Sequence, residues 1–145
     1  SAYYAGFYEK AIEHFNKAIA NYWGKHEKSK LEVKGIMCAS MILSGNVTEG
    51  LSLAKQTYDD YFNSDLGRKI KEDDYYVWAV WMSGVPPRTV RALLEVNASF
   101  DKEEMLEWLK SAKEELENPS GSHEWRNLDF TIRLDSINSA ISKLQ

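Results

Sequence analysis

The stretch MILSG at residues 41–45 returns in similar form as VWMSG at residues 80–84, and both stretches end in glycine. A third glycine, Gly6, precedes Gly45 by the same interval of 39 residues. After each glycine an apolar residue recurs six positions on and an aromatic residue sixteen positions on: Ile12, Leu51 and Val90, then Tyr22, Tyr61 and Phe100. A fixed period of this length is typical of helical repeat proteins. We expect the three glycines to mark corners between stacked helix pairs.

Apolar residues between these marks recur at steps of three and four, which indicates amphipathic helices. Short connections between consecutive helices favour antiparallel neighbours. The sequence therefore predicts an all-α fold of antiparallel helical hairpins, stacked as a short α-solenoid of about seven helices. The predicted helices are 7–22, 30–43, 47–62, 70–83, 86–98, 102–117 and 124–144.

Helix starts are marked by polar residues followed three positions later by glutamate, a spacing typical of capping boxes. The three pairs are Ser29 with Glu32, Asn46 with Glu49, and Asp101 with Glu104. Pro86 and Pro87 fit the first turn of a helix, where a missing amide hydrogen is tolerated. We therefore expect one helix to end near Gly84 and the next to begin at Pro86.

The composition is that of one ordinary globular domain spanning residues 1–145, with 43% hydrophobic and 28% charged residues. The chain opens on Ser1 rather than Met, which fits a processed form or a fragment of a longer chain. A net charge of −4 disfavours nucleic acid and membrane surfaces as partners. No apolar run reaches the roughly 20 residues of a membrane span, so we expect a soluble, cytoplasmic protein.

The segment 6–19 resembles the second half of a tetratricopeptide repeat. Its glycine, aromatic and alanine positions are all occupied as in that family, by Gly6, Tyr8, Ala11, Phe15 and Ala18. The later units depart from the pattern, and the period of 39 exceeds the roughly 34 residues of that family. The resemblance implies a protein-binding scaffold of helical hairpins. Because the best unit lacks its own first helix, we expect homodimerisation to be possible through the N-terminal helix.

No catalytic, cofactor or metal signature is recognisable, so the sequence predicts a protein that is not an enzyme. His14, His26 and His123 lack metal-ligand spacing, and Cys38 lies in an apolar helical run typical of a buried, inert thiol. A single cysteine also excludes an intrachain disulfide. The acidic run 72–74 is expected in a first helical turn, where negative charge complements the helix dipole.

The densest aromatic cluster suggests a partner-binding surface on the predicted helix 70–83. If that helix lines a concave groove, its groove side carries tryptophan and tyrosine, which are frequent at interface hot spots. The alternative is that these aromatic residues fill the core. The predicted partner-binding residues are Lys71, Asp74, Tyr75, Trp78 and Trp81.

We therefore expect a non-enzymatic interaction module that binds a protein or peptide through a helical face, aromatic at its centre and acidic at its rim. One alternative is a bacterial immunity or antitoxin-type protein that neutralises a basic toxic enzyme. Another is a helical small-ligand sensor or enzyme that uses the aromatic cluster and the acidic run 72–74.

Overall fold

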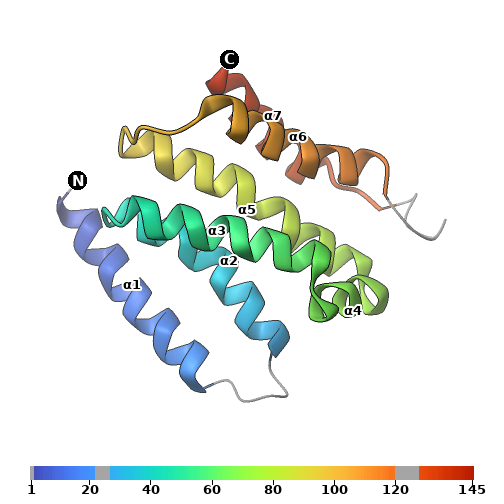
Figure 1. Cartoon of the computed structure of the whole chain (residues 1–145), viewed down its shortest axis with the longest axis horizontal. Helices are drawn as coiled ribbons and strands as arrows, with labels where there is room; N and C mark the ends of the chain where they lie inside the picture. Colours follow the sequence, from blue (N-terminus) through green and yellow to red (C-terminus); the bar gives the residue numbers. More distant parts are fainter. Residues whose placement is uncertain (1, 22–26, 120–127) are drawn as a thin grey trace.

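The computed structural model describes residues 2–21, 27–119 and 128–145, and these residues form seven α-helices and no strand (Figure 1). The prediction of an all-α fold with about seven helices is confirmed. The helices are α1 (Ala2–Asn21), α2 (Glu27–Leu43), α3 (Val47–Asn63), α4 (Asp65–Asp73), α5 (Tyr75–Glu95), α6 (Lys102–Glu117) and α7 (Thr131–Leu144).

Helix α5 is the centre of the molecule, because α2, α3, α4, α6 and α7 all pack against it. In Figure 1, α3 lies in front of α2, and α6 lies in front of α7. The two front helices meet through Tyr58, whose ring packs edge-to-face on Trp108 and whose hydroxyl lies 3.1 Å from Ser111 Oγ. This order of contacts fits a bundle around α5 as well as a short solenoid, so the stacked-hairpin arrangement stays a prediction.

The core is built around the apolar side chains of α5. Trp78 is fully buried, and its indole Nε1 donates a 2.7 Å hydrogen bond to the carbonyl oxygen of Tyr61. Met82 and Leu93 continue the same buried row along α5. A buried tryptophan needs a partner for its N–H group, and the carbonyl oxygen of Tyr61 is that partner for Trp78. Two aromatic residues that the sequence singled out, Tyr75 and Trp78, are therefore core residues.

One helix corner lies at Gly45, as predicted, and another with the same backbone geometry lies at Asn97. Both residues have positive φ, +105° for Gly45 and +53° for Asn97. The hydrogen bonds match as well: Asn46 N donates to Met41 O, and Ala98 N donates to Leu93 O. These bonds define the same left-handed helix ending, which glycine adopts most readily and asparagine tolerates.

The prediction that all three spaced glycines are corners is wrong. Gly6 lies inside α1, and Gly84 lies buried inside α5. Helix α5 also continues through Pro86 and Pro87, so the predicted break between helices 70–83 and 86–98 is wrong. Interior proline normally destabilises a helix by about 3 kcal/mol, because it removes a hydrogen bond and crowds the preceding turn. Both prolines are buried, and packing around α5 outweighs this local preference.

A real break lies instead at Asp74, inside the predicted helix 70–83. Asp74 Oδ1 accepts a 3.2 Å hydrogen bond from Val77 N and caps α5, while α4 ends one residue earlier. Residues 72 and 73 thus lie in the last turn of α4, so their predicted place in a first helical turn is wrong. Helix α4 itself is capped by Ser64, whose Oγ accepts from Gly67 N at 2.9 Å.

The remaining boundaries are close to the predictions. Asp101 caps α6 through a 3.1 Å bond from Glu104 N, as expected. Asn46 occupies the N-cap of α3 but makes no side-chain cap bond, and Ser29 lies inside α2 rather than before it. Helix α7 begins at Thr131, later than the predicted 124. Several residues named above lie outside the described residues: Tyr22, His26, His123 and the first part of the predicted helix 124–144.

Candidate functional site

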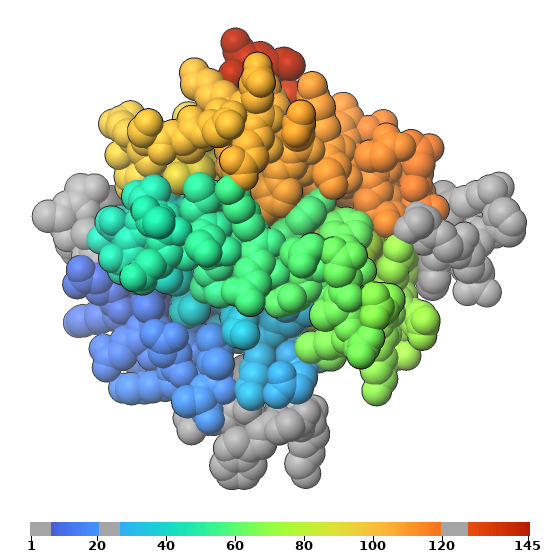
Figure 2. Space-filling model, viewed as in Figure 1, coloured from blue at the N-terminus to red at the C-terminus, as the bar shows by residue number. Residues whose placement is uncertain are grey.

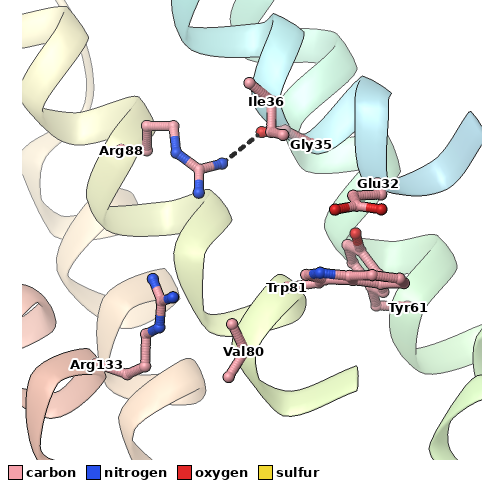
Figure 3. Close-up of a pocket in the computed structure, with 8 residues that line it drawn as sticks. All are labelled: Glu32, Gly35, Ile36, Tyr61, Val80, Trp81, Arg88 and Arg133. Atoms are coloured by element: carbon pink, nitrogen blue, oxygen red, sulfur yellow. Dashed lines mark hydrogen bonds between the residues drawn. The ribbon is translucent and has the colours of Figure 1, made fainter. Parts of the chain in front are cut away.

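A pocket of about 210 Å³ lies where α2, α5 and α7 meet (Figure 3). Gly35 lets α2 approach α5 closely, since a Cβ atom there would lie 3.3 Å from a methyl group of Val85. By contrast, the face with α3, α4 and α6 is closely filled by side chains (Figure 2). The pocket is lined by Glu32, Gly35, Ile36, Tyr61, Val80, Trp81, Arg88 and Arg133.

Arg88 is the innermost charge of this pocket. Its guanidinium Nη1 donates a 2.8 Å hydrogen bond to the carbonyl oxygen of Gly35 (Figure 3). The side chain folds back over Gly84, where a Cβ atom would lie only 2.8 Å from Arg88 Nη2. Burial lowers the pKa of Arg88 most, and the nearby Arg133 lowers it further. The group still stays protonated, because a guanidinium does not lose its proton in proteins.

Arg133 reaches the same pocket from α7, and its guanidinium extends toward Arg88 (Figure 3). Arg133 lies in the first turn of α7, just after Thr131, whose N–H group donates a 2.9 Å bond to Asp129 Oδ1. Glu32 lies across the pocket, beside Tyr61. Within residues 27–119 and 128–145, none of the three pocket charges has an oppositely charged side chain within 4.0 Å.

The remaining walls offer aromatic surface and hydrogen-bond donors. Trp81 is half-buried, with its ring nitrogen on the side of the arginines (Figure 3), and Lys28 Nζ lies 5.4 Å from its ring centroid. Tyr61 is buried, and its hydroxyl donates a long 3.5 Å bond to Leu31 O. Burial, and then the charge of Glu32, raise the pKa of Tyr61, so its hydroxyl keeps its proton.

Exposed apolar side chains surround this pocket. A neighbouring cavity of about 280 Å³ shares Arg133 and is lined by Tyr76 and Ile132 as well. Ile132 is 79% exposed, Tyr76 is 47% exposed, and Ile36 at the first pocket is 41% exposed. We call this surface the arginine face and define it by six residues: Ile36, Tyr76, Trp81, Arg88, Ile132 and Arg133.

Two of the predicted binding residues are core residues. Tyr75 and Trp78 are fully buried, which agrees with the alternative that these aromatic residues fill the core and not with a place in a groove. Lys71 Nζ pairs with Glu115 Oε1 at 3.2 Å, and Asp74 is the exposed cap of α5. Only Trp81 lines the pocket. The prediction assumed one continuous helix over 70–83. Because the helix breaks at Asp74, the side chains before and after this residue do not share one helix face.

The arginine pair itself was missed by sequence reasoning. Arg88 did leave a signal, because Gly84 stands four residues before it on the same face of a helix. A small residue in that position leaves room for a long side chain to fold back. Arg133 left no such signal in the sequence, because only the packing of α7 on α5 brings it to the pocket.

Other candidate sites in the described part of the chain are less favourable. Cys38 is buried and its Sγ donates to Lys34 O at 2.8 Å, while burial raises its pKa to about 11. The predicted buried thiol is therefore confirmed, and it is a poor nucleophile at neutral pH. Within the described residues, no group of three or more His, Cys, Asp or Glu side chains is placed to hold a metal ion. No described helix combines the length and apolarity needed to cross a membrane.

The chain matches no protein-family model, no curated protein and no solved structure. The resemblance of residues 6–19 to a tetratricopeptide repeat therefore stays a prediction.

Proposed function

We propose that this protein is a non-enzymatic interaction module that binds a protein or peptide partner through the arginine face. One observation supports this most. Of the four large hydrophobic side chains that the described residues expose, three (Ile36, Tyr76 and Ile132) border the pockets that contain Arg88 and Arg133. Clustered exposed apolar residues mark interaction surfaces, whereas isolated ones are ordinary.

The chemistry of this face suits a protein interface. Tryptophan, tyrosine and arginine are the residues that most often dominate binding energy, and the face contains all three. Burying its apolar side chains against a partner would contribute about 25 cal/mol for each Å² removed from water. The face is built on packed helices, so binding would require little ordering of the backbone.

The size of the pocket favours this function over a small-ligand sensor. Small-molecule sites usually enclose about 300–1,000 Å³. The pocket of about 210 Å³ is better matched to one side chain of a larger partner. The centre of the pocket is basic. In this proposal, arginines framed by apolar residues therefore replace the aromatic centre and acidic rim that the sequence predicted.

The immunity-type alternative predicts a different surface. A basic toxic enzyme would contact acidic side chains, and α6 exposes several of them, including Glu103 and Glu107. The exposed side chains of α6 are polar or charged, so that surface offers no large apolar anchor. We therefore favour the arginine face and use α6 as its control.

Quantitative affinity capture from the native host tests the proposal. The face variant carries Ile36→Ser and Ile132→Ser, and the control carries Glu103→Ser and Glu107→Ser on α6. All four side chains are exposed, so both variants should keep the helical circular dichroism of the wild type. We expect the face variant to lose most of the specifically recovered partner and the control to keep it. Loss in the control alone would contradict the proposal and favour the immunity-type function.

A further inference from the structure

We propose that the pocket between Arg88 and Arg133 receives the carboxylate of an aspartate or glutamate side chain from the partner. This inference rests on the proposed function and names the chemistry that the arginine face recognises. Its basis is the unmatched hydrogen-bonding capacity of two arginines that point into one pocket with apolar walls.

The guanidinium of Arg88 has five N–H donors, and one of them is used by the carbonyl oxygen of Gly35. Within the described residues, the side chain of Arg133 forms no hydrogen bond or ion pair. Partly buried donors without acceptors are unfavourable, and a carboxylate can accept two parallel bonds from a guanidinium. An oxyanion between the two arginines would therefore satisfy both groups and relieve their mutual repulsion.

The charges of the pocket select a singly charged anion. Among the residues that line the pocket, Arg88 and Arg133 contribute two positive charges and Glu32 one negative charge, which leaves an excess of one positive charge. Lys28 does not line the pocket and lies against the Trp81 ring. A carboxylate neutralises this excess. A phosphate group carries close to two negative charges at neutral pH and would be repelled by Glu32. The small volume, about 210 Å³, also fits a side-chain carboxylate better than a bulkier group.

The other walls suit the rest of an acidic segment. Val80 and Ile36 offer apolar contact to the methylene groups of an aspartate or glutamate side chain. Glu32, across from the arginines, can accept a hydrogen bond from a backbone N–H group of the same segment. An internal segment continues on both sides of its acidic residue and so offers Glu32 a backbone N–H group on either side, whereas a chain end continues on one side only. We therefore commit to an internal acidic side chain.

Side-chain NMR spectra of the ¹⁵N-labelled full chain provide the test. The Nε–H signals of Arg88 and Arg133 and the indole signal of Trp81 report on the pocket directly. Four probes are titrated: acetyl-Leu-Glu-Leu-amide, its glutamine counterpart, acetyl-Leu-Leu with a free terminal carboxylate, and inorganic phosphate. We expect saturable shifts with the glutamate peptide and binding at least about 10-fold weaker for the other three probes, because a charge-assisted bond pair is lost or opposed.

Matched arginine variants complete the experiment. Arg133→Gln should lower the affinity for the glutamate peptide by about 10-fold or more, while Arg91→Gln should leave this affinity unchanged. Arg91 lies on α5 near Arg88 but does not line this pocket. Equal binding of the glutamine peptide, tighter binding of phosphate or of the free chain end, or equal effects of the two variants would overturn the inference. So would the absence of saturable shifts with the glutamate peptide.

The two proposals fail separately. The glutamate peptide could fail to bind while the double variant, Ile36→Ser with Ile132→Ser, still loses its partner. The face would then bind partners without recognising a carboxylate. If the peptide binds but the captured partner does not depend on the face, the pocket recognises carboxylates for another purpose.

Discussion

Two charged side chains at helix contacts, Glu115 and Arg88, are treated in opposite ways by this fold. Glu115 on α6 is buried and faces two donors, Lys71 Nζ at 3.2 Å and the Tyr75 hydroxyl at 3.1 Å. Lys71 in turn lies 4.5 Å from the ring centroid of Trp78. The charge of Glu115 is therefore compensated by neighbours from α4 and α5.

Arg88 on α5 is half-buried and has only the carbonyl oxygen of Gly35 as a hydrogen-bond partner among the described residues. After burial, the largest influence on the pKa of Arg88 is a second cation, Arg133, which lowers this pKa rather than stabilising the charge. This fold therefore surrounds the buried charge of Glu115 with a cation and a hydroxyl donor, and it provides no such partner side chain for Arg88 among the described residues. Under the proposal made above, neutralisation of the arginine pocket is left to a partner.

Removal of Glu115 should have the largest effect on stability. Glu115→Ala deprives Lys71 and the buried Tyr75 hydroxyl of the carboxylate that they contact. We expect a loss of about 2–3 kcal/mol in the free energy of unfolding, at the lower end for a broken buried pair because Lys71 keeps some access to water. Urea denaturation measures it, with the exposed Glu107→Ala as control. Equal losses in the two variants would show that the Glu115 contacts add little.

Alkaline pH should weaken both regions. Burial raises the pKa of Cys38, near Arg88, from 9.0 to about 11, and that of Tyr58, near Glu115, from 10.0 to about 12. The folded state thus favours the protonated groups. Their contribution is complete below pH 9, and it is lost as the pH rises from 9 to about 12. Each group should account for roughly 3 kcal/mol.

Unfolding free energies measured from pH 8 to 12 test this dependence. In Cys38→Ala the decline between pH 9 and 11 should become shallower, and in Tyr58→Phe the decline between pH 10 and 12 should do so. An unchanged decline in both variants would mean that other groups cause the alkaline loss.

Replacement of Arg88 should have the smallest effect on stability. Arg88→Met keeps a long apolar side chain over Gly84 and removes a poorly compensated charge. We expect the free energy of unfolding to stay within about 1 kcal/mol of the wild type, because apolar replacements of such charges are often neutral. Thermal and urea unfolding check this. A loss as large as that of Glu115→Ala would show that the two charges have the same structural role.

The helices with local signals could be predicted from the sequence. The boundaries of α3 and α6 follow from apolar periodicity and from the polar residues before them, and Asp101 does cap α6. The corner at Gly45 was also readable, because its left-handed backbone favours glycine.

The helix boundaries in the middle of the chain could not be predicted in this way. Gly84, Pro86 and Pro87 carry the local signature of a helix end, yet contacts with five surrounding helices keep α5 continuous. Asp74 ends one helix and begins another without any proline or glycine beside it. The candidate site was therefore not predicted, because Arg88 and Arg133 line one pocket only after α2, α5 and α7 have packed.

The most direct test of the central claim measures Arg133→Gln in two ways, by its unfolding free energy and by its affinity for the glutamate peptide. If the arginines of the pocket serve a partner rather than the fold, stability stays within about 0.5 kcal/mol of the wild type, and affinity falls about 10-fold or more. A clear loss of stability with unchanged peptide affinity would contradict the account and make Arg133 a structural residue.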